Sequence, residues 1–323
     1  MKRFIANLVL GTVGTIAGLA APLAQAQDFP SKPIHLVIPA AAGGSTDIIG
    51  RILAKSITER YGVSVIVENK AGASGSIGVH AVVQAPPDGY TLLVSTPDAV
   101  TVFPLVTKNA PYVTTDLTPI TLVASTPYVF AINAQLPAKT MEEFMALSKT
   151  QPLAMATPGS GSSGRIVLEM FKQRAGIDLL HVPYKGAGPA LQSVIAGETH
   201  IAATSPVTLR SFVESGKLRA LAISTKARSP VMPNVPTMID LGFDDFDVAA
   251  WFGVFAPLGV PASVAEKLDE MVRGAASSPE YVALTTKLGL GTEPVSRDKF
   301  GAMLAAETER WQQLIESANI RSD

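Results

Sequence analysis

The stretch TPGSGSSGRIVLEMF, residues 157–171, places a glycine-rich turn between an apolar segment and a helical pattern. Its glycines Gly159, Gly161 and Gly164 have the G-x-G-x-x-G spacing of dinucleotide-binding proteins. Such a site needs an acidic residue about 20 residues further on to hold a ribose, and the chain reads Tyr184-Lys185-Gly186 there. The turn also lacks the Gly-Lys-Ser/Thr ending of a P-loop. We therefore expect no nucleotide and no other cofactor here.

A second stretch, IPAAAGGSTDIIGRILAKSI at 38–57, has the same order of strand, small-residue turn and helix. The start of a helix offers unpaired N–H groups and the positive end of the helix dipole, and glycine lets an anion approach the backbone. Two such turns facing each other across a cleft would form an anion clamp. The hydroxyl donors of this predicted clamp are Ser45, Thr46, Ser160, Ser162 and Ser163. The alternative is that both turns are ordinary helix caps.

The pattern around these turns alternates short apolar runs with amphipathic segments, which indicates an α/β fold with mainly parallel sheets. The expected strands are 34–39, 63–69, 90–95, 153–157, 179–182 and 199–203. The expected helices are 46–61, 76–84, one from 165, one from 189, 262–276 and 299–318. Their buried faces are predicted at Ile48, Ile49, Ile52 and Leu53 in the first helix, and at Ile166, Val167, Met170 and Phe171 in the helix from 165.

Two further apolar runs, 120–132 and 248–256, predict strands that connect two lobes. The chain would leave the first lobe, build the second and return. We expect the first lobe at 27–126, the second at 127–248, and the return to the first lobe with C-terminal helices at 249–323. A cleft between lobes joined by a hinge is a place where ligand sites concentrate.

Composition excludes several classes of function. Charged residues make up 16% of the 323 residues and the net charge is −1, so the chain has no basic field for nucleic acid. It has no cysteine and only four histidines, without metal-ligand spacing. Neither glycine-rich turn reads G-x-S-x-G, the nucleophile turn of many hydrolases. These features argue against a metal site and against an enzyme.

The first 26 residues have the organisation of a secretory signal. Lys2 and Arg3 precede an apolar stretch, and Ala24-Gln25-Ala26 fits the small-x-small cleavage pattern. We expect cleavage after Ala26 and a periplasmic location; an uncleaved membrane anchor is the alternative.

Seven stretches in order resemble the periplasmic solute receptors of tripartite tricarboxylate transporters, the Bug receptors. They are IPAAAGGSTDIIGR (38–51), VENKAGASGSIG (67–78), APPDGYTLLVS (85–95), VPYKGAGPALQSVIAGE (182–198), GKLRALAIS (216–224), RSPVMPNVPT (228–237) and WFGVFAPLGVP (251–261). The resemblance implies a two-lobed type II periplasmic binding fold. It also implies a small organic carboxylate in the cleft and a two-component membrane symporter as partner.

The resemblance also implies which residues bind the ligand. The first loop contributes Ala42, Gly43, Gly44, Ser45, Thr46 and Asp47, and the second contributes Gly159, Ser160, Gly161, Ser162, Ser163 and Arg165. Further ligand-facing positions are Ser95, Thr96, Thr204 and Ser205. Many members of the family have His at the position of Arg165, and the planar fork of Arg suits a second carboxylate.

We therefore expect a monomeric solute-binding protein, not an enzyme, that captures a dicarboxylate or an aromatic carboxylate by lobe closure. Two alternatives stay open. The chain would serve a signalling system as its ligand-sensing partner, or it would be a secreted serine hydrolase.

Overall fold

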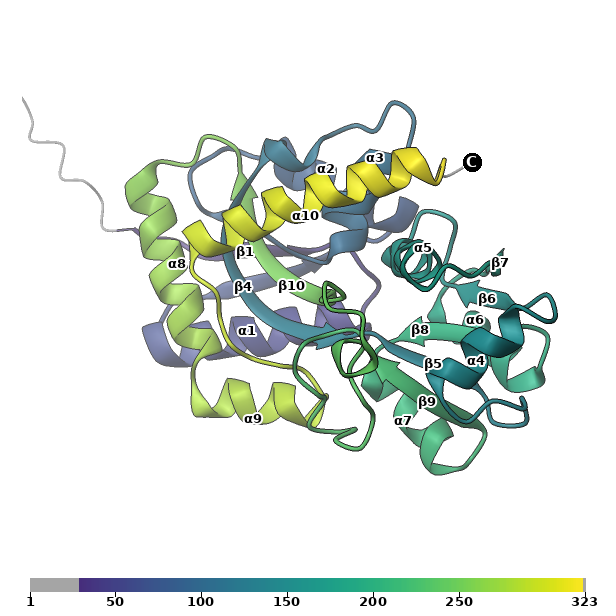
Figure 1. Cartoon of the computed structure of the whole chain (residues 1–323). Coiled ribbons are helices and arrows are strands. Elements are labelled where there is room, and N and C mark those ends of the chain that lie inside the picture. Colours follow the sequence, from purple (N-terminus) through teal and green to yellow (C-terminus); the bar gives the residue numbers. More distant parts are fainter. Residues whose placement is uncertain (1–28, 322–323) are drawn as a thin grey trace, which may run out of the picture.

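The computed structural model describes residues 29–321, and its strands form two five-stranded sheets (Figure 1). The first sheet has the order β2-β1-β3-β10-β4, and the second has the order β7-β6-β8-β5-β9. The strands of the first are β1 Ile34–Ile38, β2 Val65–Asn69, β3 Thr91–Ser95, β4 Leu117–Pro127 and β10 Ala249–Pro257. Those of the second are β5 Val129–Asn133, β6 Ala154–Thr157, β7 Leu180–Pro183, β8 Ile201–Thr204 and β9 Leu218–Ile223.

Both sheets are mixed in the same way. In the first sheet β1 runs parallel to β2 and β3, while β10 lies antiparallel between β3 and β4. In the second, β6 runs parallel to β7 and β8, and β5 lies antiparallel between β8 and β9. Parallel neighbours need crossover connections, which the helices supply. The predicted two-lobed α/β fold is therefore confirmed.

Helices flank both sheets (Figure 1). The first lobe carries α1 Ser45–Tyr61, α2 Ser76–Val83, α3 Phe103–Val106, α8 Ala262–Ala276, α9 Pro279–Lys287 and α10 Arg297–Ser317. The second carries α4 Met141–Ser148, α5 Ser163–Ala175, α6 Ala187–Ala196 and α7 Pro206–Glu214. Short turns η1 Ala73–Gly75, η2 Asp98–Val102, η3 Thr114–Asp116 and η4 Ile239–Leu241 complete the connections. Within residues 29–321, we find no helix with the length and apolar character that a membrane span requires.

The buried faces of α1 and α5 follow from their sequence patterns. The four residues predicted for α5 are all at most 7% exposed. In α1, Ile49 and Leu53 are fully buried, but Ile48 is 36% exposed because it points toward the space between the lobes. The prediction for Ile48 was therefore wrong. α1 ends at Gly62, whose φ of 69° is left-handed, as glycine allows.

The lobes are joined where β4 meets β5. Only Tyr128 separates the two strands, so the apolar run predicted as one strand at 120–132 is divided between the sheets. After the second lobe is built, the chain returns to β10, which pairs with β4 from Ala249 opposite Pro127 to Pro257 opposite Leu117. β4 and β10 therefore form the part of the first lobe that adjoins the hinge. The residue boundaries assigned above to the lobes stay a prediction.

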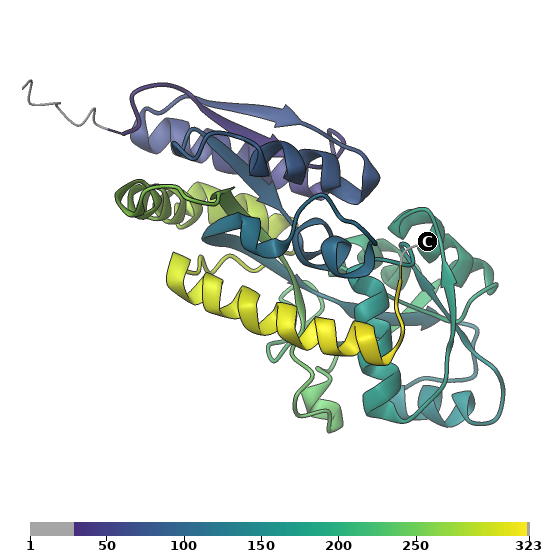
Figure 2. The same ribbon diagram turned by 90° about the horizontal axis from the view of Figure 1, so that it is seen from above.

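Helix α10 packs on both lobes. Phe300 and Leu304 belong to an apolar cluster of the first lobe that includes Trp251. About two to three turns beyond Leu304, Trp311 and Leu314 join the core that contains α5 of the second lobe. Figures 1 and 2 show the C-terminal end of α10 beside the second lobe. From the sequence, α10 was expected to contact the first lobe alone. Helical periodicity indicates the buried face of a helix, but it does not tell which lobe each part of that face contacts.

Candidate functional site

Four connections from a strand to a helical segment converge between the lobes. In the first lobe β1 leads to α1 and β3 leads to η2; in the second β6 leads to α5 and β8 leads to α7. Ligands of open α/β sheets bind at the carboxyl ends of their strands, where helices begin. A cavity of about 420 Å³ lies at this point, lined by residues of all four connections. Its volume is within the range of small-molecule sites.

The turn before α1 is shaped by Asp47. Its carboxylate accepts hydrogen bonds from the N–H of Gly43 (2.8 Å), from Arg51 Nε (2.9 Å) and from Asn69 Nδ2 (2.9 Å). The hydrogen bond from Arg51 is the main cause that lowers the pKa of Asp47 to about 2. Asp47 is buried, with its oxygens turned into the loop. The side chain therefore holds the loop in shape from inside the protein.

The first turn of α1 is left without a side-chain cap. Its N-cap residue is Gly44, which has no side chain to accept a hydrogen bond. Ser45 lines the cavity beside this turn, and Ile48 follows it. The uncapped N–H groups and the dipole of a 17-residue helix favour an anion at this end.

The first turn of α5 is occupied by groups of the protein. Ser162 is the N-cap, and its hydroxyl accepts from the N–H of Arg165 at 3.3 Å. The N–H of Ser163 donates to Asp98 Oδ1 at 2.6 Å, across the interface between the lobes. Tyr128, at the hinge, donates its hydroxyl to Ser163 Oγ at 2.6 Å. Burial raises the pKa of Asp98, and the hydrogen bonds from Ser163 oppose this shift.

Sequence reasoning missed Asp98. It lies three residues after the end of β3 in the stretch STPDAV, residues 95–100, and our prediction stopped at Thr96. An acidic residue just beyond a strand end was the signal that would have found it.

Helix α7 presents a third helix start to the cavity. It begins with Pro206 at its first position, which suits the fixed φ of proline. Thr204 and Ser205 line the cavity just before it, and Ser205 Oγ lies 2.8 Å from Thr208 Oγ1. Ser205 makes no side-chain cap to the backbone of α7. Val207, in the first turn, is 45% exposed and also lines the cavity.

The structure brings together part of the predicted site. The residues predicted from the sequence that line the 420 Å³ cavity are Ser45, Thr96, Ser162, Ser163, Thr204 and Ser205. A second cavity of about 630 Å³ adjoins it and is lined by Gly159, Ser160 and Gly161, with Thr96 and Ser162 shared. The lining of these two cavities does not include Ala42, Gly43, Gly44, Thr46, Asp47, Ser95 or Arg165.

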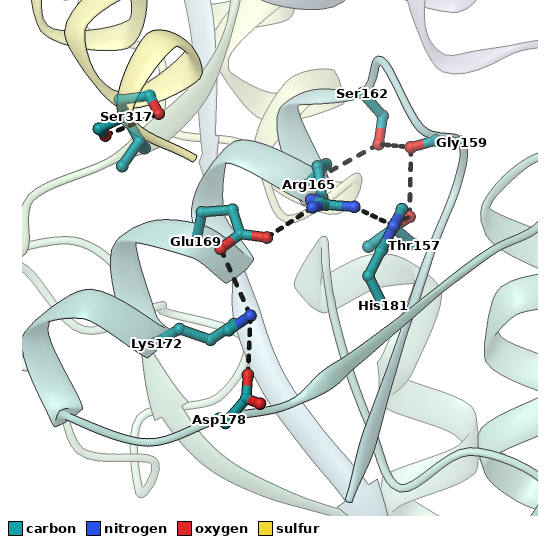
Figure 3. Close-up of polar contacts among 10 residues, drawn as sticks. Thr157, Gly159, Ser162, Arg165, Glu169, Lys172, Asp178, His181 and Ser317 are labelled. Atoms are coloured by element: carbon teal, nitrogen blue, oxygen red, sulfur yellow. Dashed lines mark hydrogen bonds and ion pairs between the residues drawn. The ribbon is translucent and has the colours of Figure 1, made fainter. Parts of the chain in front are cut away.

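Arg165 lies in a polar network beside the second loop (Figure 3). One guanidinium nitrogen is 2.8 Å from Glu169 Oε1, and another contacts His181 Nδ1. Burial is the main cause that lowers the pKa of His181 to about 4, and Arg165 adds to the effect, so the ring is neutral at pH 7. Nδ1 faces a cation and accepts, which leaves Nε2 to donate to Thr157 Oγ1 at 2.6 Å.

The network ends in the glycine-rich loop itself. Thr157 Oγ1 donates to the carbonyl of Gly159 at 3.2 Å, and Ser162 Oγ donates to the same carbonyl at 2.8 Å. Arg165 is thus connected to the loop through His181 and Thr157. In the structure its guanidinium contacts protein groups, so its predicted contact with a ligand stays a prediction.

The cavity lining is largely apolar. The residues that give it this character are Ile48, Ile49, Tyr128, Val207, Phe252, Leu288 and Leu290. Its hydroxyl groups come from the strand ends and helix starts described above. In the described part of the chain, no group of His, Asp and Glu side chains has an arrangement that would hold a metal ion.

Two lobes of matching topology around a cavity at their strand ends define a solute-binding protein of the periplasmic type. The family follows from comparison with known proteins. Residues 49–320 match the family described as "Tripartite tricarboxylate transporter family receptor", and the chain belongs to this family.

Relatives in this family share about a third of the sequence. Protein BugT of Bordetella pertussis is 34% identical over 98% of this chain and 97% of its own length. A solved structure described as Rpa4515 of R. palustris with adipate is 29% identical, with a TM-score of 0.79 over 92% of this chain and 100% of that one. MatC of Rhodopseudomonas palustris with bound malate is 28% identical, with a TM-score of 0.74 over 89% and 100%.

Proposed function

We propose that this protein captures a small organic carboxylate between its lobes and delivers it to a two-component membrane symporter. The observation that carries the proposal is the convergence of strand ends and helix starts around one cavity between the lobes. Family membership supports it, as do the relatives whose structures contain adipate and malate.

The ligand carboxylate binds between the starts of α1 and α7. Neither helix start has a side-chain cap, so the first-turn N–H groups are available to an anion, except at Pro206, which has no N–H. Ser45 and Ser205 stand beside these turns and supply hydroxyl donors. The loop at Ala42 to Gly44 supports α1 from outside the cavity, and Asp47 keeps that loop in shape.

The body of the ligand packs against the apolar part of the lining. Phe252, Leu288 and Ile48 offer an apolar surface, against which the hydroxyl groups of a citrate-like or sugar-like ligand would lose water without gaining hydrogen bonds. Of the two classes expected from the sequence, this surface favours an aromatic carboxylate. A second ligand carboxylate was expected at Arg165, whose guanidinium here pairs with Glu169 and His181.

The protein acts by binding and not by catalysis. A serine hydrolase needs a base that hydrogen-bonds to its nucleophile. Within residues 29–321, the hydroxyls of Ser45, Ser162, Ser163 and Ser205 make no hydrogen bond to a histidine. Export is part of the proposal, but its predicted signal at residues 1–26 lies outside the described residues.

Thermal melting with a panel of mono-, di- and tricarboxylates and aromatic acids tests the proposal. A ligand at about 100 times its dissociation constant adds about 2.7 kcal/mol of stability, which raises the melting temperature by several degrees. The same acids as methyl esters are the control, because they keep the body and remove the charge. Equal shifts with acids and esters, or no shift with any acid, would contradict carboxylate capture. Loss of uptake in a deletion strain tests the delivery step.

A further inference from the structure

The cavity between the lobes contains a single acidic or basic side chain among the described residues. Among the residues that line it, Asp98 is the only Asp, Glu, Lys, Arg or His. It also lines the adjoining cavity, so it stands at the junction of the two. A site proposed for an anion therefore presents a carboxyl group to its ligand and no side-chain cation.

Asp98 also occupies one of the helix starts. Its Oδ1 accepts the N–H of Ser163 at 2.6 Å, in the first turn of α5. A helix start of this kind ordinarily attracts an anion from solution, and here a carboxyl group of the protein holds the place. Ser163 Oγ is engaged as well, since Tyr128 donates to it at 2.6 Å. The starts of α1 and α7 have no such occupant.

A second ligand carboxylate would have to bind beside Asp98 or displace it. Two carboxylates within a few ångströms repel each other in a largely apolar cavity, unless a cation or a proton separates them. Displacement would leave the Asp98 carboxyl group without the N–H of Ser163. Both routes disfavour a ligand with two carboxylates, whereas a single carboxylate at α1 and α7 avoids them.

We propose that Asp98 restricts the cavity to ligands with one carboxylate, by occupying the helix start where a second carboxylate would bind. The inference rests on the proposed function and narrows it. By this inference the ligand of this chain carries one carboxylate. Adipate and malate, which are bound in the two solved relatives above, each carry two.

Matched pairs of acids test the inference by titration calorimetry. Benzoate is compared with terephthalate, and hexanoate with adipate, so that each pair shares a body and differs in one carboxylate. For the wild type we expect the monocarboxylate of at least one pair to bind ten or more times as tightly as its dicarboxylate. Asp98→Ala should reduce the ratio of the two affinities, monocarboxylate to dicarboxylate, about tenfold. The reason is that the substitution removes the carboxyl group from the first turn of α5.

Two further variants complete the experiment. Asp98→Asn keeps an acceptor for Ser163 and cannot ionise, so it should reduce the ratio of affinities less than Asp98→Ala does. Asp245→Asn removes one negative charge from an exposed side chain that pairs with Arg174, and it should leave the ratio unchanged. Thermal melting of each variant confirms that it is folded, and Asp98→Asn carries the test if Asp98→Ala does not fold.

The outcomes separate this inference from the proposed function. If the wild type binds dicarboxylates as tightly as their partners, or if both Asp98 variants keep the wild-type ratio, the role of Asp98 is wrong and carboxylate capture stands. If neither the wild type nor any variant binds any of the four acids, both proposals fall.

Discussion

At the scale of single residues, two charged side chains predicted to bind the ligand are turned toward the protein. Asp47 receives three different donors inside the first loop, and Arg165 contacts Glu169 and His181 beside the second. Each is connected to a glycine-rich loop, Asp47 directly and Arg165 through His181 and Thr157. Their first effect is therefore expected on stability and loop shape.

Arg165→Ala should lower the free energy of unfolding by about 1.5–3 kcal/mol, the range for hydrogen bonds to charged groups. The loss arises because Glu169, whose side chain is 10% exposed, would retain, among the described residues, the ion pair with Lys172 at 3.6 Å alone. Urea unfolding measures the change. Arg174→Ala, which removes an exposed pair with Asp245, is the matched control and should cost less than 1 kcal/mol. Equal stability of the two variants would show that the Arg165 network contributes little.

Asp47→Asn should destabilise the protein by about 1–2 kcal/mol at pH 7, and by less as the pH falls toward 2. The pKa of Asp47 lies below its ordinary value of 3.8, at about 2, because Arg51 and the loop donors stabilise the ionised form. A lowered pKa adds stability above the unfolded pKa, and this stability is lost as the pH falls from about 4 to about 2. Urea unfolding of wild type and variant across this range measures the difference. A constant difference at all pH values would contradict the assignment.

For single residues, the sequence reveals the residue type but not the direction in which the side chain points. The glycines and hydroxyls of the loops were visible in the sequence, and six of the predicted residues line the cavity. The direction of Arg165 depends on His181, which lies on the neighbouring strand β7. A contact of this kind is set by packing between elements, so spacing along the chain does not predict it.

At the scale of elements, the strand-to-helix units determine the site. Most predicted bounds of β1, α1, β3 and β6 agree with the structure within a residue or two, because apolar periodicity and turn residues mark them. Elements outside that rhythm were missed: α4, α7, α9 and β9 had no prediction. The π-helical turn η2, which carries Asp98, is also one that sequence patterns rarely indicate.

The start of α1 depends on the left-handed conformation of Gly43, whose φ is 84°. Gly43→Ala should cost roughly 1–2 kcal/mol in stability, because an L-residue is strained there. It should also weaken ligand binding, because relief of the strain moves the first turn of α1. Gly62→Ala is the matched control: its φ is 69°, space for a Cβ is open at both sites, and it ends α1 far from the cavity. Calorimetry should show weaker binding for Gly43→Ala alone; equal affinities would mean that the loop does not position the helix.

Helix α10 contributes a buried acid to the hinge side of the first lobe. Glu307, which is 8% exposed, accepts from Trp251 Nε1 at 2.9 Å, and burial raises its pKa to about 7. An acid with a raised pKa costs stability as it ionises, so stability should fall as the pH rises from about 4.5 to about 7.

Glu307→Gln should therefore stabilise the protein by about 1–3 kcal/mol at pH 8 and leave it unchanged at pH 4. The amide keeps an acceptor for Trp251 and never ionises. Thermal unfolding at both pH values measures the effect. A variant less stable than wild type at pH 8 would show that Glu307 is ionised and stabilised in the native state.

At the scale of the whole molecule, the two lobes meet around the cavity. The hydrogen bond from the N–H of Ser163 to Asp98 joins the lobes across the site, while β4, Tyr128 and β5 join them at the hinge. The C-terminal turns of α10 add an apolar contact with the second lobe. The division into two α/β lobes was predictable because the rhythm of strand and helix occurs twice along the chain, whereas the strand order within each sheet was not predicted. The contacts between lobes were not, because they depend on how two finished units pack.

Carboxylate capture between the lobes is tested by a crystal structure of the protein with the tightest-binding acid of the melting screen. We expect one carboxylate within hydrogen-bond distance of the first-turn N–H groups of α1 and α7, with the body of the acid against Phe252 and Ile48. Asp98 should keep its hydrogen bond to Ser163. A ligand bound outside the space between the lobes, or one whose carboxylate contacts neither helix start, would contradict the account.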